Sequence, residues 1–439
     1  MQGAFLFFKN IDMKKLIKTS IFFFAFVFTI HAQQEKGIIG ADNWLDNWTN
    51  FRSSKTDYSQ PSKTLKGKIS TDTKLLKSET YLLVGKVYVT NNAVLSIEPG
   101  TVILGDSEGT LIITRGASIM AVGKQTDPIV FTSSKEVKSA GDWGGIIILG
   151  DAPINKFGNS SSIYLDLDPS LTGYGGTNEQ GNAGALKFVR IEYAGRKTTP
   201  SGNLSGLLVA GVGLATDFKN VMVSFSAGDS FTAYGGKFRG SKLISYKCIN
   251  DDYNFTQGVE VVLYNSIGIR STYLSSSKGN SRCINVSNYI NKDETDFSKS
   301  KTLVKLKNVT FLNDSNDIKG DIEQGLIKEA IYVGESTSID ATKTVISGFN
   351  PAVVIDKKTV INKDNLDKIK LTEMYFNLCN GNIFSEGNPD NGDIESWFGA
   401  ALFKNYYAKS SNKETFIMPS GNNPDYRLQI DKISESLKN

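Results

Sequence analysis

The amino-acid sequence predicts an all-β protein whose short strands stack as a solenoid, that is, a parallel β-helix. Short runs of β-branched residues recur along the 439 residues and are bounded by Gly, Asn, Asp and Ser. Several of these runs are continuously apolar, as expected for a parallel sheet that is covered on both faces. Similar units recur about every 20 residues, which is too short for a strand–helix–strand unit of about 30.

The N-terminal residues 1–32 have the pattern of a secretory signal peptide. From Met13 the chain reads MKKLIKTSIFFFAFVFTIHA, with a lysine-rich start, an apolar run at 21–30 and a small residue at Ala32. Met13 is also an alternative start of the protein. The apolar run is too short to span a bilayer, and no second run of this kind follows. We therefore expect an exported chain without a transmembrane span, located in the periplasm, at the outer membrane or on the cell surface.

The composition excludes several function classes. Without residues 1–32 the chain has 45 basic and 44 acidic residues, so no basic excess indicates nucleic-acid binding. The one histidine, His31, lies inside the predicted signal, which excludes catalytic triads and histidine metal ligands from the mature chain. Cys248, Cys283 and Cys379 match no zinc or redox spacing.

The repeat is most visible in the middle of the chain. Val-Met-Val-Ser-Phe (221–225), Lys-Leu-Ile-Ser-Tyr (242–246) and Val-Val-Leu-Tyr-Asn (261–265) align on Val223, Ile244 and Leu263, at spacings of 21 and 19 residues. A further copy starts at Lys307. We place the β-helix at residues 76–360, because strand-like runs fill this range.

The segment Gly-Asp-Trp-Gly-Gly-Ile-Ile-Ile-Leu-Gly (141–150) illustrates one side of a coil. It has neither the phosphate-loop pattern nor a following helix, so 146–149 is predicted to be a buried strand. Gly145 and Gly150 then mark sharp corners, with a positive φ expected at Gly145. The stretches 157–183 and 290–301 lack the strand pattern and are predicted to leave the stack as long loops.

Both ends of a β-helix must be capped, because its end strands expose unpaired backbone. Residues 33–75 carry Trp44, Trp48 and Phe51 in a polar context and are predicted to form the N-terminal cap segment. Residues 361–439 form the C-terminal cap region. Within it, 393–408 is predicted to be a short capping helix with Asp393 as N-cap. Its predicted apolar face consists of Trp397, Ala401, Leu402 and Tyr406.

Three strings carry a resemblance to a known family: GDWGGIIILGDAPIN, YGGTNEQGNAGALKFVRIEYAG and GGKFRGSKLISYKCINDDYNFTQG. They resemble secreted right-handed parallel β-helix proteins of Bacteroidetes and some other Gram-negative bacteria, with a pectin-lyase-like coil. The resemblance covers about residues 80–270 and implies a right-handed coil and export. The family has no assigned activity. Its acidic motif has further acids where this chain has Tyr253 and Asn254.

The densest polar cluster is Asn250-Asp251-Asp252-Tyr253-Asn254. Oxygen ligands from Asp251, Asp252 and Asn254 suit a structural Ca²⁺, the one cofactor that the sequence suggests. The alternative is that these residues form turn and capping bonds at a coil corner.

Two further sets of residues are candidates for a site. Arg190 and Glu192 lie two apart on one strand face and, with Asp142, form a weak candidate for an acid/base patch; the alternative is a salt bridge. The second set is aromatic and is expected to be exposed for a ligand or partner, with Trp143 and Tyr174 as the main candidates. Its other members are Trp44, Trp48 and Tyr234, and the alternative for the tryptophans is the core of a cap.

Two function classes remain. The first is an exported non-catalytic binding or scaffold protein of the cell envelope, with a glycan or an outer-membrane protein as partner. The alternative is a polysaccharide lyase or glycoside hydrolase acting on an acidic or neutral glycan. The absence of histidine and of a clear carboxylate pair favours the first class.

Overall fold

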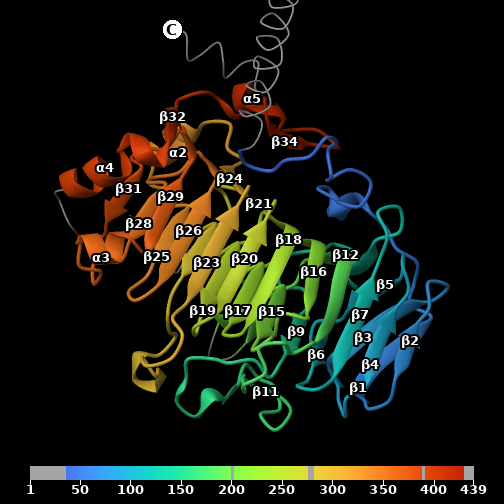
Figure 1. Cartoon of the computed structure of the whole chain (residues 1–439). Coiled ribbons are helices and arrows are strands. Elements are labelled where there is room, and N and C mark those ends of the chain that lie inside the picture. Colours follow the sequence, from blue (N-terminus) through green and yellow to red (C-terminus); the bar gives the residue numbers. More distant parts are fainter. Residues whose placement is uncertain (1–35, 199–201, 275–280, 388–390, 430–439) are drawn as a thin grey trace, which may run out of the picture.

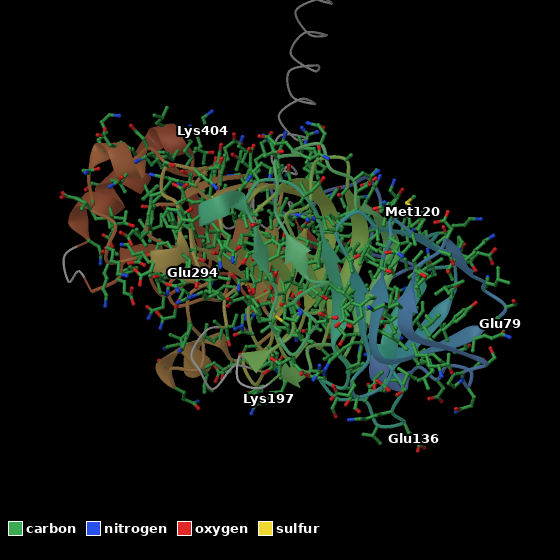
Figure 2. All side chains as sticks on the ribbon, turned by 90° about the horizontal axis from the view of Figure 1, so that it is seen from below. Glu79, Met120, Glu136, Lys197, Glu294 and Lys404 are labelled. Atoms are coloured by element: carbon green, nitrogen blue, oxygen red, sulfur yellow. The ribbon has the colours of Figure 1, made fainter. Side chains whose placement is uncertain are left out.

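The computed structural model describes residues 36–198, 202–274, 281–387 and 391–429. The chain forms a right-handed parallel β-helix with three faces per coil, which we call faces I, II and III (Figure 1). Glu79, in the first coil, and Lys404, beside the last strand of the parallel stack, lie at opposite ends of the molecule (Figure 2).

Each face is a ladder of parallel strands that belong to successive coils. Face I contains β5 (Val102–Gly105), β8 (Ile129–Ser133), β21 (Ile267–Arg270), β24 (Thr310–Asn313), β27 (Val345–Ser347), β30 (Tyr375–Asn377) and β32 (Tyr406–Ala408). Face II contains β6 (Thr110–Ile113), β9 (Gly145–Leu149), β15 (Leu207–Ala210), β17 (Phe231–Tyr234), β19 (Tyr253–Thr256), β22 (Ile284–Val286), β25 (Ile331–Val333), β28 (Val353–Ile355) and β31 (Ile383–Ser385). Face III contains β2 (Thr73–Leu75), β4 (Val94–Ile97), β7 (Ser118–Val122), β20 (Glu260–Tyr264), β23 (Leu303–Lys307), β26 (Ser338–Thr342) and β29 (Ile369–Thr372).

Five longer strands turn a corner and contribute to two faces. From face I to face II run β1 (Lys63–Ile69) and β3 (Thr80–Val89). From face III to face I run β12 (Gly184–Glu192), β16 (Asp217–Ser224) and β18 (Lys237–Tyr246). Inward side chains of all three faces form one apolar core along the stack.

The register corrects the predicted repeat. On face I, Met222 pairs with Ile244 and Ile244 with Ile267, so the true spacings here are 22 and 23 residues. Val223 pairs with Ser245, so the predicted alignment of Val223 with Ile244 is wrong by one residue. Leu263 lies on face III, so its predicted alignment with these face I residues is wrong by one face. The strand 242–246 is nevertheless one coil further along than 221–225, as predicted.

The corner between faces III and I is a single residue with positive φ in successive coils. These residues are Phe188, Asn220, Lys242, Asn265, Asn308, Lys343 and Glu373, with φ of 49–56°. Such a conformation favours Asn but is strained for the other residue types. Their identity varies, and this explains why the repeat is hard to align from sequence.

Gly145 and β9 agree with the prediction for the 141–150 segment. Residues 146–149 are buried in β9, and Gly145 has φ of 111°. A Cβ at Gly145 would lie 2.4 Å from the Ser205 carbonyl oxygen, so glycine is required here by conformation and by space.

The predicted N-terminal cap segment packs along the side of the stack instead of across its first coil. Gly37 N donates to the Lys343 carbonyl over 2.8 Å, and Ser53 Oγ donates to the Tyr193 hydroxyl over 2.8 Å. The segment therefore runs along face I from late coils to early ones. We call residues 36–58 the strap; they include a 3-10 turn at Ser53–Lys55.

The strap covers outward apolar side chains of face I. Its own apolar residues Ile38, Trp44, Leu45, Trp48 and Phe51 are buried against Met222, Ile244, Ile267, Ile269, Leu312, Val345 and Tyr375. Burying each large apolar side chain stabilises the fold by about 1.5–3 kcal/mol. This cover is the physical reason that the strands of face I are apolar on both sides.

The C-terminal hairpin β33 (Phe416–Met418) and β34 (Asp425–Leu428) lies on the same side as the strap (Figure 1). Phe416, Tyr426 and Leu428 belong to the same cluster. The Arg427 guanidinium donates to the Gly40 and Ala41 carbonyls over 2.8 and 3.0 Å. The strap and the C-terminal hairpin thus contact each other over face I.

The C-terminal capping helix is present but is shorter than predicted. It is α4 (Gly392–Phe398), followed by a 3-10 turn at Ala401–Phe403 and by β32. Its N-cap is Asn391 instead of Asp393, and its buried side chains are Ile394 and Phe398. Leu402 is 85% exposed, so the predicted apolar face is wrong. The other short helices are α2 (Ile318–Glu323), α3 (Lys363–Leu366) and α5 (Asn412–Thr415).

The parallel stack extends beyond the predicted range 76–360 at both ends. It begins at β1, which pairs only with β3, and it ends at β31 and β32. The outer edge of β1 carries the exposed residues Lys63, Lys66 and Lys68. Lysines on an open edge oppose pairing with another chain. The predicted signal peptide at 1–32 lies outside the described residues.

The two predicted long loops leave the stack and meet each other. The 157–183 loop contains a 3-10 turn (Phe157–Asn159) and the short strands β10 (Ser161–Ser162) and β11 (Gly173–Tyr174). Its apolar residues pack on the early strands of face II. The Lys156 ammonium pairs with Glu294, in the 3-10 turn Lys292–Glu294 of the second loop. A smaller hairpin, β13 (Lys197–Thr198) and β14 (Gly202–Asn203), precedes β15.

Candidate functional site

The predicted acid/base residues lie close together but are covered and bonded in different ways. Arg190 and Glu192 point outward from β12 on face I, with Arg190 Nε 3.2 Å from Glu192 Oε1. The strap covers them: Arg190 donates to the Trp48 carbonyl and to the Tyr58 hydroxyl. Burial raises the pKa of Glu192, which is 1% exposed, and Arg190 opposes this shift. The pair is a buried salt bridge without access to a polymeric substrate.

Asp142 belongs to a different hydrogen-bond group. Its carboxylate accepts from Ser133 Oγ at 2.7 Å, Lys135 Nζ at 2.8 Å and the Ser139 amide at 2.8 Å. These bonds close the loop between β8 and β9. The Asp142 amide donates to the Tyr193 carbonyl over 3.0 Å, so Asp142 lies next to Glu192 as predicted, but its carboxylate bonds this loop instead of the Arg190–Glu192 pair.

The expectation of exposed aromatic residues is wrong for Trp143 and Tyr174. Trp143 stacks on Phe131 in the core, and its indole Nε1 donates to the Glu192 carbonyl over 2.7 Å. Tyr174 is buried where the long loop covers face II, and its hydroxyl donates to Gln257 Oε1 over 2.7 Å. Trp44 and Trp48 are buried in the strap, and Tyr234 packs beside Tyr174.

The Asp/Asn cluster lies at the corner between faces I and II, where the chain turns from β18 into β19. Asp252 points into the corner and is fully buried. Its Oδ1 accepts from Ser245 Oγ at 2.6 Å, Cys248 Sγ at 3.0 Å and Arg270 at 3.2 Å. Arg270, from the end of β21, supplies the compensating charge and lowers the pKa of Asp252, which burial raises. This buried ion pair needs both partners, because one alone would be an uncompensated charge.

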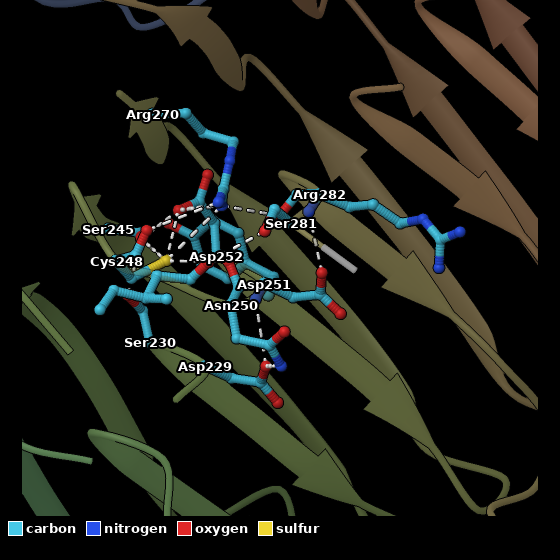
Figure 3. Close-up of polar contacts among 12 residues, drawn as sticks. Asp229, Ser230, Ser245, Cys248, Asn250, Asp251, Asp252, Arg270, Ser281 and Arg282 are labelled. Carbon is cyan, nitrogen blue, oxygen red and sulfur yellow. Dashed lines mark hydrogen bonds and ion pairs between the residues drawn. The ribbon is translucent and has the colours of Figure 1, made fainter. Parts of the chain in front are cut away.

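Asp251 and Asn254 point elsewhere (Figure 3 shows Asp251). Asp251 Oδ1 accepts from the Arg282 amide at 2.8 Å. Asn254 directs its amide nitrogen at Asp229 Oδ2, 2.8 Å away. The three predicted Ca²⁺ ligands thus do not converge, and the described residues contain no group of three or more His, Cys, Asp or Glu placed to hold a metal ion. The bonds formed join neighbouring coils and are largely between side chains, so they are not the local turn bonds of the alternative interpretation.

Asp229, which the sequence analysis missed, organises the outer side of this corner. Its carboxylate accepts from Asn250, the Asp251 amide, Thr232 and Asn254. Burial, and then the nearby Asp229, raise the pKa of Asp251 to about 7. The corner therefore places a carboxyl group that titrates near neutral pH beside a second carboxylate.

From this corner, an open row of side chains extends along the outer side of face II. It consists of Asn254, Asn285, Tyr332, Val354 and Phe384, which are paired in register on β19, β22, β25, β28 and β31. All five are half-buried, whereas the alternating inward residues are fully buried. Neighbouring strands lie about 4.8 Å apart, so the row presents two amides on adjacent strands, followed by the Tyr332 and Phe384 rings with Val354 between them. We call it the amide–aromatic row.

Charged groups hold the central ring of the row in place. The Arg282 guanidinium lies 4.1 Å from the Tyr332 ring centroid, and its Nε lies 2.5 Å from Glu329 Oε1. The Tyr332 hydroxyl donates to Asp356 Oδ2 over 2.7 Å. The early strands of the same face are covered, because Ile154 and, from the first long loop, Ile163 and Tyr174 pack on them. No sequence pattern indicates the row, since its members come together only through the register of the strands.

A cleft of about 940 Å³ lies at the C-terminal end, between α3, β29 and α4. Its lining includes Trp397, Leu366 and Phe403, with Lys363 and Asp393 of opposite charge among the other residues. Since both charges occur there, charge selects no ligand class for this cleft.

Comparison with known proteins agrees with this architecture. A family model described as a pectate-lyase-like β-helix domain matches residues 67–415. The chain belongs to this family. The matched range begins within β1 and includes the rest of the parallel stack to β32, with the whole amide–aromatic row.

No curated protein matches the chain. Among solved structures, the enzymatically active domain of tailspike protein 2 from bacteriophage CBA120 is similar at 12% identity, with a TM-score of 0.22. The match covers 76% of this chain and 42% of the tailspike chain. A similarity at this level carries no argument about function.

Proposed function

We propose that this protein is an exported, non-catalytic glycan-binding protein of the cell envelope and that its ligand lies along the amide–aromatic row. The observation that carries the proposal is the row itself, an open line of amides and rings on face II. Aromatic faces pack on the apolar sides of sugar rings, and amides both donate to and accept from hydroxyl groups. Membership of a pectate-lyase-like family supports a glycan as the ligand class.

Export and envelope location belong to the same proposal and are supported by the signal-like sequence before Gln33. No helix in the described ranges is long and apolar enough to cross a membrane. An outer-membrane protein remains a proposed partner of the glycan-bound form.

A binding screen tests the proposal directly. The mature chain is applied to a panel of neutral and acidic glycans, and the best ligand is titrated by calorimetry. Replacing Asn285→Ala and Tyr332→Ala together is expected to weaken binding at least about tenfold, in line with the loss of a stacked ring and an amide. Tyr264→Ala, a half-exposed tyrosine on face III, is the matched control and retains affinity. Unchanged affinity of the double variant would contradict the proposal.

The pKa of Asp251 supports a second candidate function, that of a glycoside hydrolase or polysaccharide lyase. A carboxyl group that titrates at about 7 beside a second carboxylate has the protonation behaviour of an acid/base pair. Since Asp251 is only 1% exposed, catalysis would require this corner to open toward the substrate. Assays for new reducing ends and for unsaturated products on the same panel test it. Turnover by the wild type that Asp251→Asn and Asp229→Asn each abolish would support the enzyme over the binding protein.

A further inference from the structure

Face III differs from the other two faces in the charge of its outward side chains. From β12 to β29, seven outward positions are basic and three are acidic. The basic residues are Lys187, Lys219, Lys237, Arg239, Lys305, Lys307 and Lys370, and the acidic ones are Asp217, Glu260 and Asp340. Because the chain without residues 1–32 is close to neutral, this excess is a local concentration of charge. We call these outward positions the basic face.

Five of these cations are exposed and form no ion pair with another described residue. They are Lys219, Arg239, Lys305, Lys307 and Lys370. The other two are paired, Lys187 with Asp217 at 2.6 Å and Lys237 with Glu260 at 2.9 Å. The unpaired charges therefore define the electrostatic character of the face.

The basic face is bare and carries apolar groups between its charges. In Figure 1, β20, β23 and β26 face the viewer and no other described element lies in front of them. Tyr264, 39% exposed, pairs in register with Lys307, and Val262 pairs with Lys305. The strands from β16 to β29 span five steps of about 4.8 Å, or roughly 24 Å. Lys370 lies at the rim of the basic face, where it lines the cleft beside α4. The other four unpaired cations are spread over a broad sheet surface.

We propose that the basic face binds an anionic lipid surface. Lysine and arginine side chains near a membrane are attracted to its negative surface potential, and their contributions accumulate with number. Their long alkyl stems and a tyrosine ring are the groups that enter the headgroup region. A planar membrane can contact Lys219, Arg239, Lys305 and Lys307 together, because these four lie on neighbouring strands outside the cleft. A single soluble polymer chain, without groove walls to hold it, contacts only some of them.

Vesicle sedimentation with the mature chain tests this binding. We expect at least tenfold more protein on vesicles of phosphatidylcholine with phosphatidylglycerol than on phosphatidylcholine alone. Binding is expected to be lost near 1 M salt, where charges are screened within about 3 Å. Replacing Lys305→Glu and Lys307→Glu is expected to abolish it. The control Lys55→Glu with Lys413→Glu makes the same charge change on the side of face I and retains binding.

Three outcomes would overturn the proposal. These are equal binding to both kinds of vesicle, an equal loss in both double variants, and binding of soluble dextran sulfate through Lys305 and Lys307 without vesicle binding. Thermal melts of both variants establish that they are folded. The variant with Asn285→Ala and Tyr332→Ala is expected to bind vesicles normally, so failure of the glycan proposal is distinguishable from failure of this one.

Discussion

Faces I and III are built by the same coils, and three strands, β12, β16 and β18, run through both. Yet the outward positions of face I are largely apolar and lie under the strap, whereas those of face III are charged and bare. The strand periodicity of two makes both possible, because the inward residues build one core for either face. What the outward residues contact, and not the coil itself, decides whether a face serves stability or binding.

The largest expected effect is the loss of a strap anchor. Trp48 is fully buried between the strap and face I and stacks edge-on against Phe188. Trp48→Ala is expected to lower the free energy of unfolding by about 3–5 kcal/mol, because it leaves a cavity. On the bare face, Tyr264→Ala is expected to change it by only about 0.5 kcal/mol. If denaturant titrations give the same loss of unfolding free energy for Trp48→Ala and Tyr264→Ala, the covered face I contributes no more to stability than the bare face III.

A smaller loss is expected at a coil corner. Gly145→Ala places a Cβ against the Ser205 carbonyl in a residue with positive φ, which we expect to cost about 1–3 kcal/mol. The matched control is Gly173→Ala, where the nearest atom to a new Cβ is 4.0 Å away. Chemical denaturation compares them. A Gly145→Ala variant as stable as the parent would show that this corner tolerates a side chain.

A pH-dependent effect is expected at Asp251. Its pKa in the folded protein is about 7, well above the roughly 3.9 of an unfolded chain. A carboxyl group with a raised folded pKa contributes stability that is fully present below about pH 4 and is lost as the pH rises to about 7.

Melting temperatures measured between pH 4 and 7 test this dependence. The advantage of the wild type over Asp251→Asn is expected to shrink as the pH rises. Lys305→Gln, on the basic face, serves as the control and is expected to give a curve parallel to the wild type. If the curve of melting temperature against pH for Asp251→Asn is also parallel to that of the wild type, the raised pKa of Asp251 is contradicted.

The smallest effect is expected from calcium. Because Asp251, Asp252 and Asn254 each bond a different protein group, we expect identical melting curves in CaCl₂ and in EDTA. A ligand that binds only the folded state would raise the melting temperature. If calcium raises the melting temperature of the wild type but not that of Asp252→Ala, the cluster binds calcium as the sequence suggests.

The fold was largely predictable from local patterns. The sequence patterns correctly predict the strand at 146–149, the positive φ of Gly145 and the two long loops. Short apolar strands and turn residues are local signals, so they can be recognised without the register. The repeat register was not predictable. Its corner residue includes Phe188, Lys242 and Glu373, types that do not indicate a positive φ.

The candidate site was the least predictable part. Asn254, Asn285 and Tyr332 are adjacent in space but 31 and 47 residues apart in sequence, so only the register brings them together. Trp143 and Tyr174 illustrate the opposite error. Each lies in a glycine-rich stretch typical of a surface loop, yet its ring is buried because other segments fold over it.

The most direct test of the proposed function is a crystal structure of the mature chain with the tightest-binding oligosaccharide from the panel. We predict sugar rings over Tyr332 and Phe384, with hydroxyl groups bonded to the Asn254 and Asn285 amides. Sugar bound only on face III, or only in the cleft beside Trp397, would contradict the proposal that the amide–aromatic row is the binding site.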